Sequence, residues 1–380
     1  MEMEYGVSVP EDPTGEYGAF SRSEGTLRMA WCFPVVLSPR SWGNPYPVPY
    51  ADFLCKEPSL YRVRLSLPPG LQVLAPGREI SRTTRGGRTI VDFAHGPARE
   101  LFIAAGKGMV SATADSGGVA VRCFAPPGRE EAAALAADSA AKALEIFSRR
   151  FGPYPYASLT IVGVPLASFG LEFPGIFAIT ERILDLEATV DAVPARTLLE
   201  ATVAHETAHQ WFYGVVGSDQ AREPWLDEAT AQYATWLYFR DRYGASAASG
   251  FFRSFQERWD RVGRKPIPIG LSVWDYDARQ YGAIVYGRGP LFLHALAERM
   301  GEPAFDAFLR DWVKRFEWKI ATGSDFFALA GEECRCDLRD LFEQWVWGRR
   351  RDAPAPGAIA RTAMASLPPL LPAAFPRGSP

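Results

Sequence analysis

The most constraining feature of this sequence is a change of hydrophobic pattern near residue 126. Before it, short alternating or apolar runs such as LYRVRLSLP, TIVDFAHG and VAVRCFAPP are separated by glycine and proline. Runs of about four to eight residues between turn signals are typical of antiparallel strands. After it, GREEAAALAADSAAKALEIFSRRFG carries apolar residues at helical spacing and ends in glycine. The sequence therefore predicts an α+β protein, with a β-rich part followed by a largely helical part.

The same pattern divides the chain into three parts. Residues 1–126 are expected to form an N-terminal antiparallel β domain. Residues 127–350 are expected to form a mostly helical domain with a small β-sheet in SLTIVGVPLASFGLEFPGIFAIT. Residues 351–380 are rich in proline and alanine, which predicts a linker or docking tail. With 380 residues, of which 47% are hydrophobic, the chain is long enough for two buried cores.

Charge and cysteine content exclude several classes of partner and scaffold. Lys and Arg number 41 against 44 Asp and Glu, so the net charge of -3 offers no positive field for nucleic acid. Five scattered cysteines do not predict a disulfide framework. The sequence has no apolar run long enough for a transmembrane segment, and its start, MEMEYGVSVPEDPTG, lacks the pattern of a signal peptide. The cytoplasm is therefore favoured over the cell envelope, and no pattern indicates an oligomeric state.

Two of the four histidines, His205 and His209, lie four residues apart in TLLEATVAHETAHQWF. On a helix over residues 197–212 they project from one face, where two imidazoles can occupy two corners of a tetrahedral zinc site. Glu206 lies about 100° round the helix axis from His205. That position suits a general base better than a third ligand. The segment therefore predicts a catalytic metal site.

The third ligand is expected on the next helix, in EPWLDEATAQYATWLYF. Asp227 and Glu228 lie in its first turns on a largely apolar surface, and buried carboxylates are costly unless they are paired or bind a metal. We interpret Glu228 as the third ligand of one Zn²⁺ per chain and Asp227 as the residue that orients an imidazole. The alternative is that the histidines are core residues and the acids a solvated helix start. That alternative is disfavoured, because this spacing of histidines and glutamate seldom arises by chance.

The run HETAH at residues 205–209, followed after eighteen residues by Glu228 in WLDEA, resembles the signature of the M1 (gluzincin) family of zinc aminopeptidases. The similarity extends through AHETAHQWFYGVVGSDQAREPWLDEATAQY. The β-rich region of residues 1–126 is more loosely similar to the family's N-terminal domain, and by this resemblance it is expected to be a partial one. The resemblance implies a thermolysin-like catalytic domain behind a β domain. It also implies peptide substrates with a free N-terminus.

Two further motifs carry the resemblance. The run GLEFP from Gly170 is similar to the exopeptidase loop, which reads Gly-Met-Glu-Tyr-Pro in a bacterial branch of the family. By resemblance, Glu172 would bind the substrate's free α-amine, and the backbone of Gly170 and Leu171 would pair with the peptide as an added strand. Downstream, YGAIVYGRG resembles the segment that carries the oxyanion-stabilising tyrosine, here Tyr286. Arg288 stands where the family has lysine.

The mechanism implied is metal-assisted hydrolysis of a peptide bond. Glu206 would take a proton from water activated by zinc and pass it to the leaving amine, while Tyr286 would stabilise the oxyanion. Because the helical pattern ends near Trp347, we expect this chain to lack the C-terminal helical domain of many family members. Three alternatives stay open at this point: a zinc endopeptidase, another hydrolase on the same fold, and a catalytically silent peptide-binding module.

Overall fold

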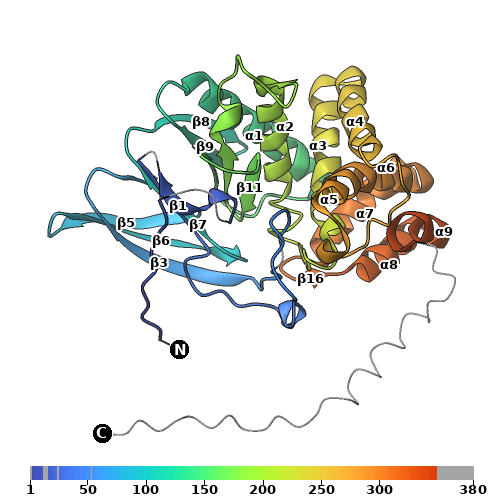
Figure 1. Cartoon of the computed structure of the whole chain (residues 1–380), viewed down its shortest axis with the longest axis horizontal. Helices are drawn as coiled ribbons and strands as arrows, with labels where there is room; N and C mark the ends of the chain where they lie inside the picture. The colour runs from blue at the N-terminus through green and yellow to red at the C-terminus, as the bar shows by residue number, and fades with distance from the viewer. Residues whose placement is uncertain (1, 12–15, 24, 53, 349–380) are drawn as a thin grey trace, which may run out of the picture.

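The computed structural model describes residues 2–11, 16–23, 25–52 and 54–348, and a β-rich part lies against a helical part (Figure 1). The blue and cyan strands of the N-terminal part lie on one side, and the yellow to red helices lie on the other. The α+β arrangement expected from the hydrophobic pattern is therefore confirmed. The segment expected to form a tail, residues 351–380, lies outside the described residues.

The described strands of the N-terminal part form two antiparallel sheets. One has four strands in the order β1-β2-β7-β4, and the other has three in the order β3-β6-β5. In β3 the sequence SLYRVRLSL alternates half-buried and exposed side chains, as expected of a strand with one covered face. The strands are β1 (Phe20–Ser23), β2 (Thr26–Ala30), β3 (Ser59–Leu67), β4 (Gln72–Leu74), β5 (Arg78–Arg85), β6 (Arg88–Ala98) and β7 (Phe102–Gly106).

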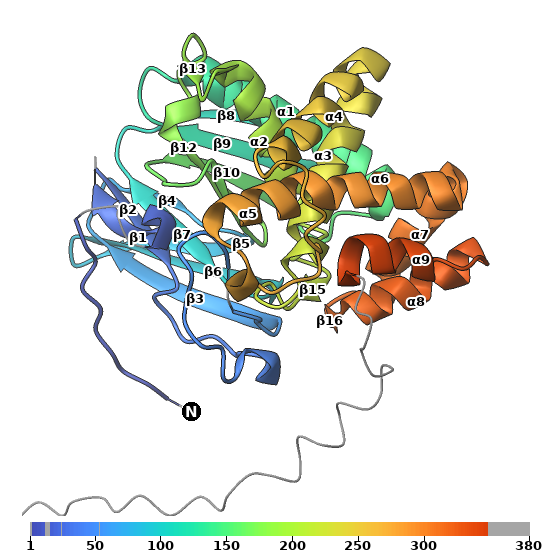
Figure 2. The ribbon, with the colours of Figure 1, turned by 45° about the vertical axis from the view of Figure 1, so that its right-hand side comes forward.

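A five-stranded mixed sheet, in the order β11-β12-β10-β9-β8, belongs to the second part (Figure 2). Its inner strands β9, β10 and β12 run parallel, and β8 and β11 pair antiparallel at the two edges. Because β8 and β9 join this sheet, it crosses the boundary expected after residue 126, and we propose a domain boundary between β7 and β8. The strands are β8 (Val110–Ser116), β9 (Val119–Ala125), β10 (Ser158–Val164), β11 (Gly170–Phe173) and β12 (Ile176–Thr180).

The helices that carry the candidate site begin close to where the sequence predicts them. The helix expected over residues 197–212 is shorter, because α2 (Ala195–Ala208) ends before His209 and the chain then turns. The next helix, α3 (Glu228–Tyr243), follows a short 3₁₀ turn at Pro224–Leu226 and begins at the expected third ligand. Tyr286 lies in a π-helical turn, η6 (Ile284–Arg288). Such turns inside helices often mark functional sites.

The remaining elements complete the helical part. The helices are α1 (Glu130–Phe151), α4 (Ala245–Asp260), α5 (Ala278–Ala283), α6 (Gly289–Met300), α7 (Glu302–Arg315), α8 (Gly323–Cys334), α9 (Arg339–Phe342) and a π-helical turn η7 (Glu343–Trp347). Two short strand pairs join β13 (Thr189–Val190) to β14 (Val193–Pro194) and β15 (Gly217–Ser218) to β16 (Ile320–Ala321). Within the described part of the chain, no helix is long and apolar enough to cross a membrane.

The cysteine pattern predicted no disulfide framework, and the structure contains one local disulfide. It joins Cys334, the last residue of α8, to Cys336. Cys32, Cys55 and Cys123 are free. The disulfide closes a loop of three residues and therefore does not connect distant parts of the fold.

Arg288, the last residue of η6, ties this turn to the end of the helical part. Its guanidinium donates hydrogen bonds to the carbonyl oxygens of Ile267 at 2.9 Å, Trp345 at 2.7 Å and Gln344 at 2.8 Å. It also lies 4.6 Å from the centre of the Trp345 ring. Because η6 carries Tyr286, Arg288 holds the segment that presents this tyrosine.

Replacing Arg288 with lysine is expected to lower the free energy of unfolding by about 2 kcal/mol. The reason is that a single ammonium group cannot donate to all three carbonyl oxygens that the guanidinium group binds. Urea unfolding would measure the change. The matched control is Arg299→Lys, since Arg299 pairs with Asp340 on the surface and should leave stability nearly unchanged. Equal losses in the two variants would contradict this role for Arg288.

Candidate metal centre

The three predicted metal ligands lie together between α2 and α3. His205 is in the last turn of α2, His209 follows the helix, and Glu228 is the first residue of α3. The Nε2 atoms of the two histidines are 3.1 Å apart. The Glu228 Oε2 atom lies 3.2 Å from Nε2 of His205 and 3.5 Å from Nε2 of His209. One potential ligand atom from each of the three residues therefore lies around a common central point.

These separations fit a tetrahedral zinc ion. Zinc bonds of about 2.1 Å to nitrogen or oxygen place two ligand atoms about 3.4 Å apart. Two imidazole nitrogens and a carboxylate oxygen are also the donor types that a catalytic zinc site uses, with a fourth position left for water or substrate. A zinc ion at this point would therefore be held by His205, His209 and Glu228.

Asp227 lies where the sequence predicts an orienting residue. Its Oδ1 atom is 2.6 Å from Nδ1 of His209, which directs the Nε2 atom of that ring toward the other ligands. Its Oδ2 atom accepts a hydrogen bond of 2.7 Å from Gln220, and the same amide lies 3.4 Å from Glu172. A buried polar chain thus links the expected amine-binding residue to a metal ligand.

Glu206 lies beside the three ligands with one free oxygen. Its side chain is buried, and its Oε2 atom has no hydrogen-bond partner. Burial raises the pKa of Glu206 to about 8, and the nearby Glu228 carboxylate adds to the rise. A carboxyl group with a pKa near neutrality can take up a proton and release it again. The position and environment of Glu206 therefore suit a general base.

The first four residues of the GLEFP run form the edge strand β11, and this strand lies alongside the ligands. Gly170, Leu171 and Glu172 all line the cavity that contains the ligands, while the side chain of Leu171 belongs to the buried core. Burial raises the pKa of Glu172 well above its ordinary value. The strand is held by Gln210, which donates to the carbonyl of Phe173 at 3.1 Å. Helix α2 and its end therefore fix the strand that carries Glu172.

Tyr286 lines the same cavity. Its ring centre is 6.0 Å from that of His205. Burial and the adjacent Glu228 carboxylate raise the pKa of Tyr286 well above the ordinary phenol value. The phenol therefore keeps its proton and can donate a hydrogen bond into the cavity.

Residues of the N-terminal part also line the cavity, among them two polar ones that sequence reasoning did not find. Tyr17 and Asp52 line it together with the ligands, Glu172 and Glu206. Desolvation raises the pKa of Asp52 to about 7. The one sequence signal for Asp52 is an acid within the largely apolar run PVPYADFLC. No motif connects that run to the histidines.

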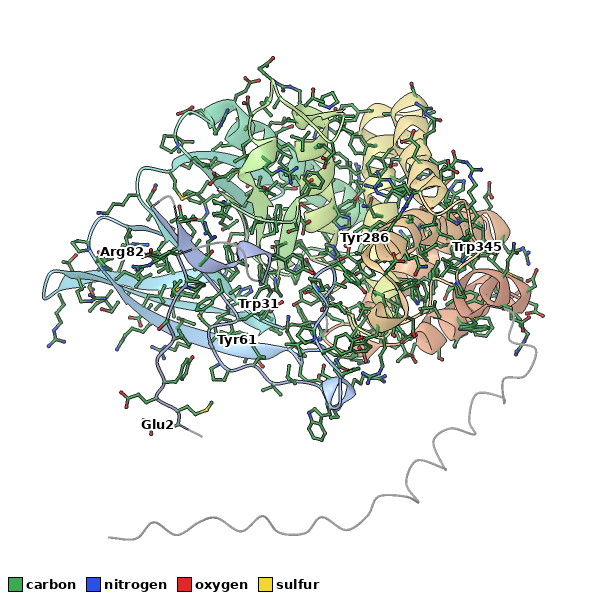
Figure 3. All side chains as sticks on the ribbon, viewed as in Figure 1. Glu2, Trp31, Tyr61, Arg82, Tyr286 and Trp345 are labelled. Carbon is green, nitrogen blue, oxygen red and sulfur yellow. A yellow bond between two sulfur atoms is a disulfide. The ribbon has the colours of Figure 1, made fainter. Side chains whose placement is uncertain are left out.

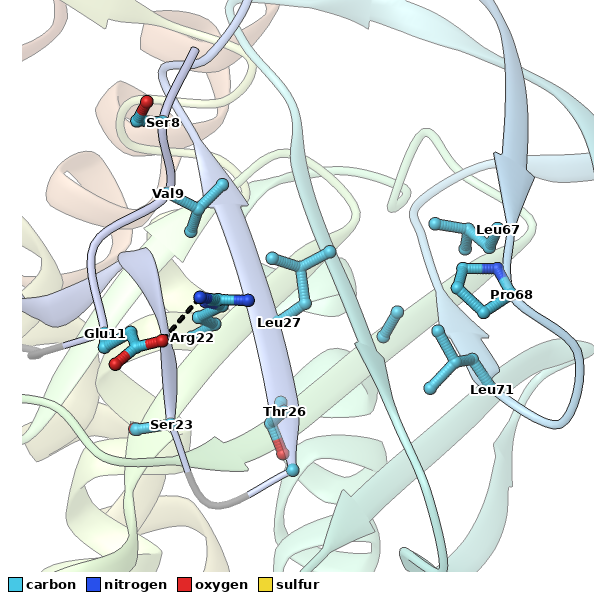
Figure 4. A pocket seen from close by; sticks show the side chains of 12 residues that line it. Ser8, Val9, Glu11, Arg22, Ser23, Thr26, Leu27, Leu67, Pro68 and Leu71 are labelled. Atoms are coloured by element: carbon cyan, nitrogen blue, oxygen red, sulfur yellow. Dashed lines mark hydrogen bonds and ion pairs between the residues drawn. The ribbon is translucent and has the colours of Figure 1, made fainter.

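The cavity with these groups measures about 130 Å³ and lies where the β-rich and helical parts meet. Figure 3 shows Tyr286 on the helical side of this region and Trp31 on the β side. A wider cavity of about 930 Å³ lies in the N-terminal part, beside Glu11, Arg22 and Leu27 (Figure 4). Because none of the predicted ligands lines the wider cavity, it is not the candidate site.

Residues 135–345, more than half of the chain, match the family model described as Peptidase family M1 domain. The chain is 28% identical over 237 residues to Aminopeptidase 2 of Candida albicans, which covers 60% of this chain and 25% of that protein. It is 24% identical over 305 residues to Aminopeptidase M1-B of Oryza sativa subsp. japonica, and this match covers 75% of this chain and 34% of that protein. The chain thus spans a quarter to a third of the length of these curated relatives.

Solved structures share the fold. The M1 zinc metallopeptidase from Deinococcus radiodurans superposes with a TM-score of 0.62 at 23% identity, covering 79% of this chain and 66% of that chain. A mutant of that protein described as bound to a Tyr-Ser-Ala substrate gives a TM-score of 0.63 at the same identity and coverage. The arrangement of a β domain before a largely helical domain is therefore found in proteins of known structure.

Proposed function

Because the chain belongs to the M1 peptidase family, we propose that it is a zinc-dependent aminopeptidase, which removes residues one at a time from a peptide with a free N-terminus. The observation that carries this proposal is the convergence of His205, His209 and Glu228 beside Glu206, in a cavity that also contains Glu172. Metal ligands, a base and an anchor for an amine are the groups that hydrolysis from the N-terminus requires.

Zinc bound by His205, His209 and Glu228 would supply Lewis-acid activation of water and of the scissile carbonyl. Glu206 accepts a proton from the attacking water at its free carboxylate oxygen and returns it to the leaving amine. Tyr286 donates a hydrogen bond to the carbonyl oxygen as negative charge develops there. These roles assign the proton transfer to Glu206 and the charge stabilisation to Tyr286.

Two carboxylates support recognition of a free N-terminus. Glu172 and Asp52 line the cavity from the helical and the β-rich parts respectively, and an α-ammonium group between them would neutralise charge that is costly to desolvate. β11 lies at the edge of its sheet, so its outer side can pair with a peptide as an added strand. The two carboxylates and the edge strand together hold the first residue of the peptide next to the metal ligands.

The proposal predicts that aminoacyl p-nitroanilides are hydrolysed and that their N-acetylated counterparts react at least about 100-fold more slowly, since acetylation removes the ammonium that Glu172 and Asp52 would neutralise. Chelation should abolish turnover, and added Zn²⁺ should restore it. The measurement is release of p-nitroaniline before and after dialysis against a chelator.

Three other outcomes would each contradict the aminopeptidase proposal. Equal cleavage of acetylated and free substrates would favour a zinc endopeptidase. A zinc-loaded protein that cleaves neither amide would favour another hydrolase on this fold. A purified protein without metal or turnover, even after Zn²⁺ is added, would favour a silent peptide-binding module.

A further inference from the structure

A second cavity adjoins the catalytic one and shares three of its residues, Tyr17, Ala51 and Asp52. It measures about 410 Å³, against about 130 Å³ for the catalytic cavity. We call it the Trp31 chamber. The described residues that line it are Tyr17, Trp31, Pro47, Val48, Pro49, Ala51, Asp52, Leu54, Lys56 and Ala167.

The geometry of an amino acid directs its side chain toward this chamber. The α-carbon carries both the ammonium and the side chain, so the first side-chain carbon lies only about 2.5 Å from the ammonium nitrogen. An ammonium beside Asp52 therefore places the start of the side chain at the junction of the two cavities. The catalytic cavity has the volume of about four water molecules. Of these two adjoining cavities, as the described residues form them, the chamber is the one with room for a large side chain.

The walls of the chamber are mainly apolar and partly rigid. Proline, valine, leucine and alanine side chains contribute to them, together with one face formed by Trp31. The Trp31 indole is fixed, because its Nε1 atom donates to Glu100 at 2.7 Å and its ring packs 5.9 Å from that of Phe173. A fixed aromatic wall favours contact with a large apolar or aromatic group.

The charged groups of the chamber disfavour charged side chains of either sign. Lys56 is buried and forms an ion pair of 2.7 Å with Glu100. A basic side chain that extended into the chamber would be repelled by the ammonium of Lys56. An acidic side chain would be repelled by the carboxylate of Asp52. Glu100 is already occupied by Lys56 and Trp31, so it is not free to pair with a substrate.

We propose that the Trp31 chamber receives the side chain of the substrate's first residue and selects large apolar or aromatic residues over small and charged ones. This inference rests on the proposed aminopeptidase function and goes beyond it by naming the substrate class. It assigns Trp31, Val48, Leu54 and Ala167 as specificity-determining residues.

Filling the chamber from Ala167 tests the proposal. Ala167 lines the chamber and is exposed, so a larger side chain there meets no tight packing. Its backbone N–H donates to the carbonyl of Tyr17, a bond that Ala167→Trp does not remove. The probes are p-nitroanilides of leucine, phenylalanine, alanine, lysine and glutamate. In the wild type, kcat/KM for leucine and phenylalanine should exceed the other three by about tenfold or more. In Ala167→Trp, the leucine to alanine ratio should fall by about tenfold.

The matched control is Ala134→Trp, at an exposed position of α1, which should keep the wild-type ratio. A wild type that prefers alanine, lysine or glutamate would overturn the chamber proposal, as would an Ala167→Trp variant that keeps the wild-type ratio or loses all five activities equally. In those cases the aminopeptidase function would still stand. A wild type that is zinc-loaded and cleaves none of the five would overturn the proposed function itself.

Discussion

Replacing Glu206 with glutamine is expected to lower kcat by at least about 10³-fold while zinc stays bound. Glutamine has the same shape as glutamate, but its amide cannot accept the proton that the attacking water must lose. The three ligand atoms that converge come from His205, His209 and Glu228, so the substitution leaves them in place. The expected result is therefore a loss of turnover without a loss of metal.

The measurement pairs steady-state hydrolysis of leucyl p-nitroanilide with elemental analysis of the purified variant. Glu200→Gln is the matched control: Glu200 lies on the same helix, α2, and accepts hydrogen bonds from Tyr238 and Tyr243 away from the cavity. Its activity should equal that of the wild type. A Glu206→Gln variant with near wild-type rates would remove Glu206 from the mechanism, and one that has lost its zinc would reassign Glu206 to metal binding.

Local spacing was enough to predict that the candidate ligands lie close together. His205 and His209 are four residues apart on a helix that includes His205 and ends just before His209, so their proximity follows from helix geometry alone. Glu228 begins the next helix and Asp227 precedes it, and this short segment carries both carboxylates to the histidines. Because each of these contacts depends on one helix or one connection, a single sequence could indicate them.

The N-terminal contribution to the site could not be predicted in the same way. Asp52 and Tyr17 reach the cavity because the β-rich part packs against the helical part, and no periodicity records that contact. Similarly, β8 and β9 look like other strands in the sequence, but β9 pairs parallel with β10 across α1 and carries β8 into the same sheet. Pairings between distant segments depend on tertiary packing, which residue patterns along the chain do not encode.

The requirement for glycine at residue 170 is also a tertiary effect. A β-carbon on Gly170 would lie 2.1 Å from Oε1 and 2.5 Å from Cδ of Glu206. Gly170 is not among the residues with positive φ, so its backbone conformation would accept alanine. The constraint therefore comes from the carboxylate of Glu206, which occupies the space that a side chain at residue 170 would need.

Gly170→Ala is accordingly expected to lower kcat by about 100-fold, because a displacement of the base by about 1 Å misaligns proton transfer. Leucyl p-nitroanilide hydrolysis would measure the loss. Gly331→Ala is the control, since a β-carbon at Gly331 meets nothing within 4 Å and alanine should be tolerated in α8. The loss should shrink in a Glu206→Asp background, where the shorter side chain withdraws from residue 170. An equal loss in both backgrounds would show that Gly170 acts through something other than the position of Glu206.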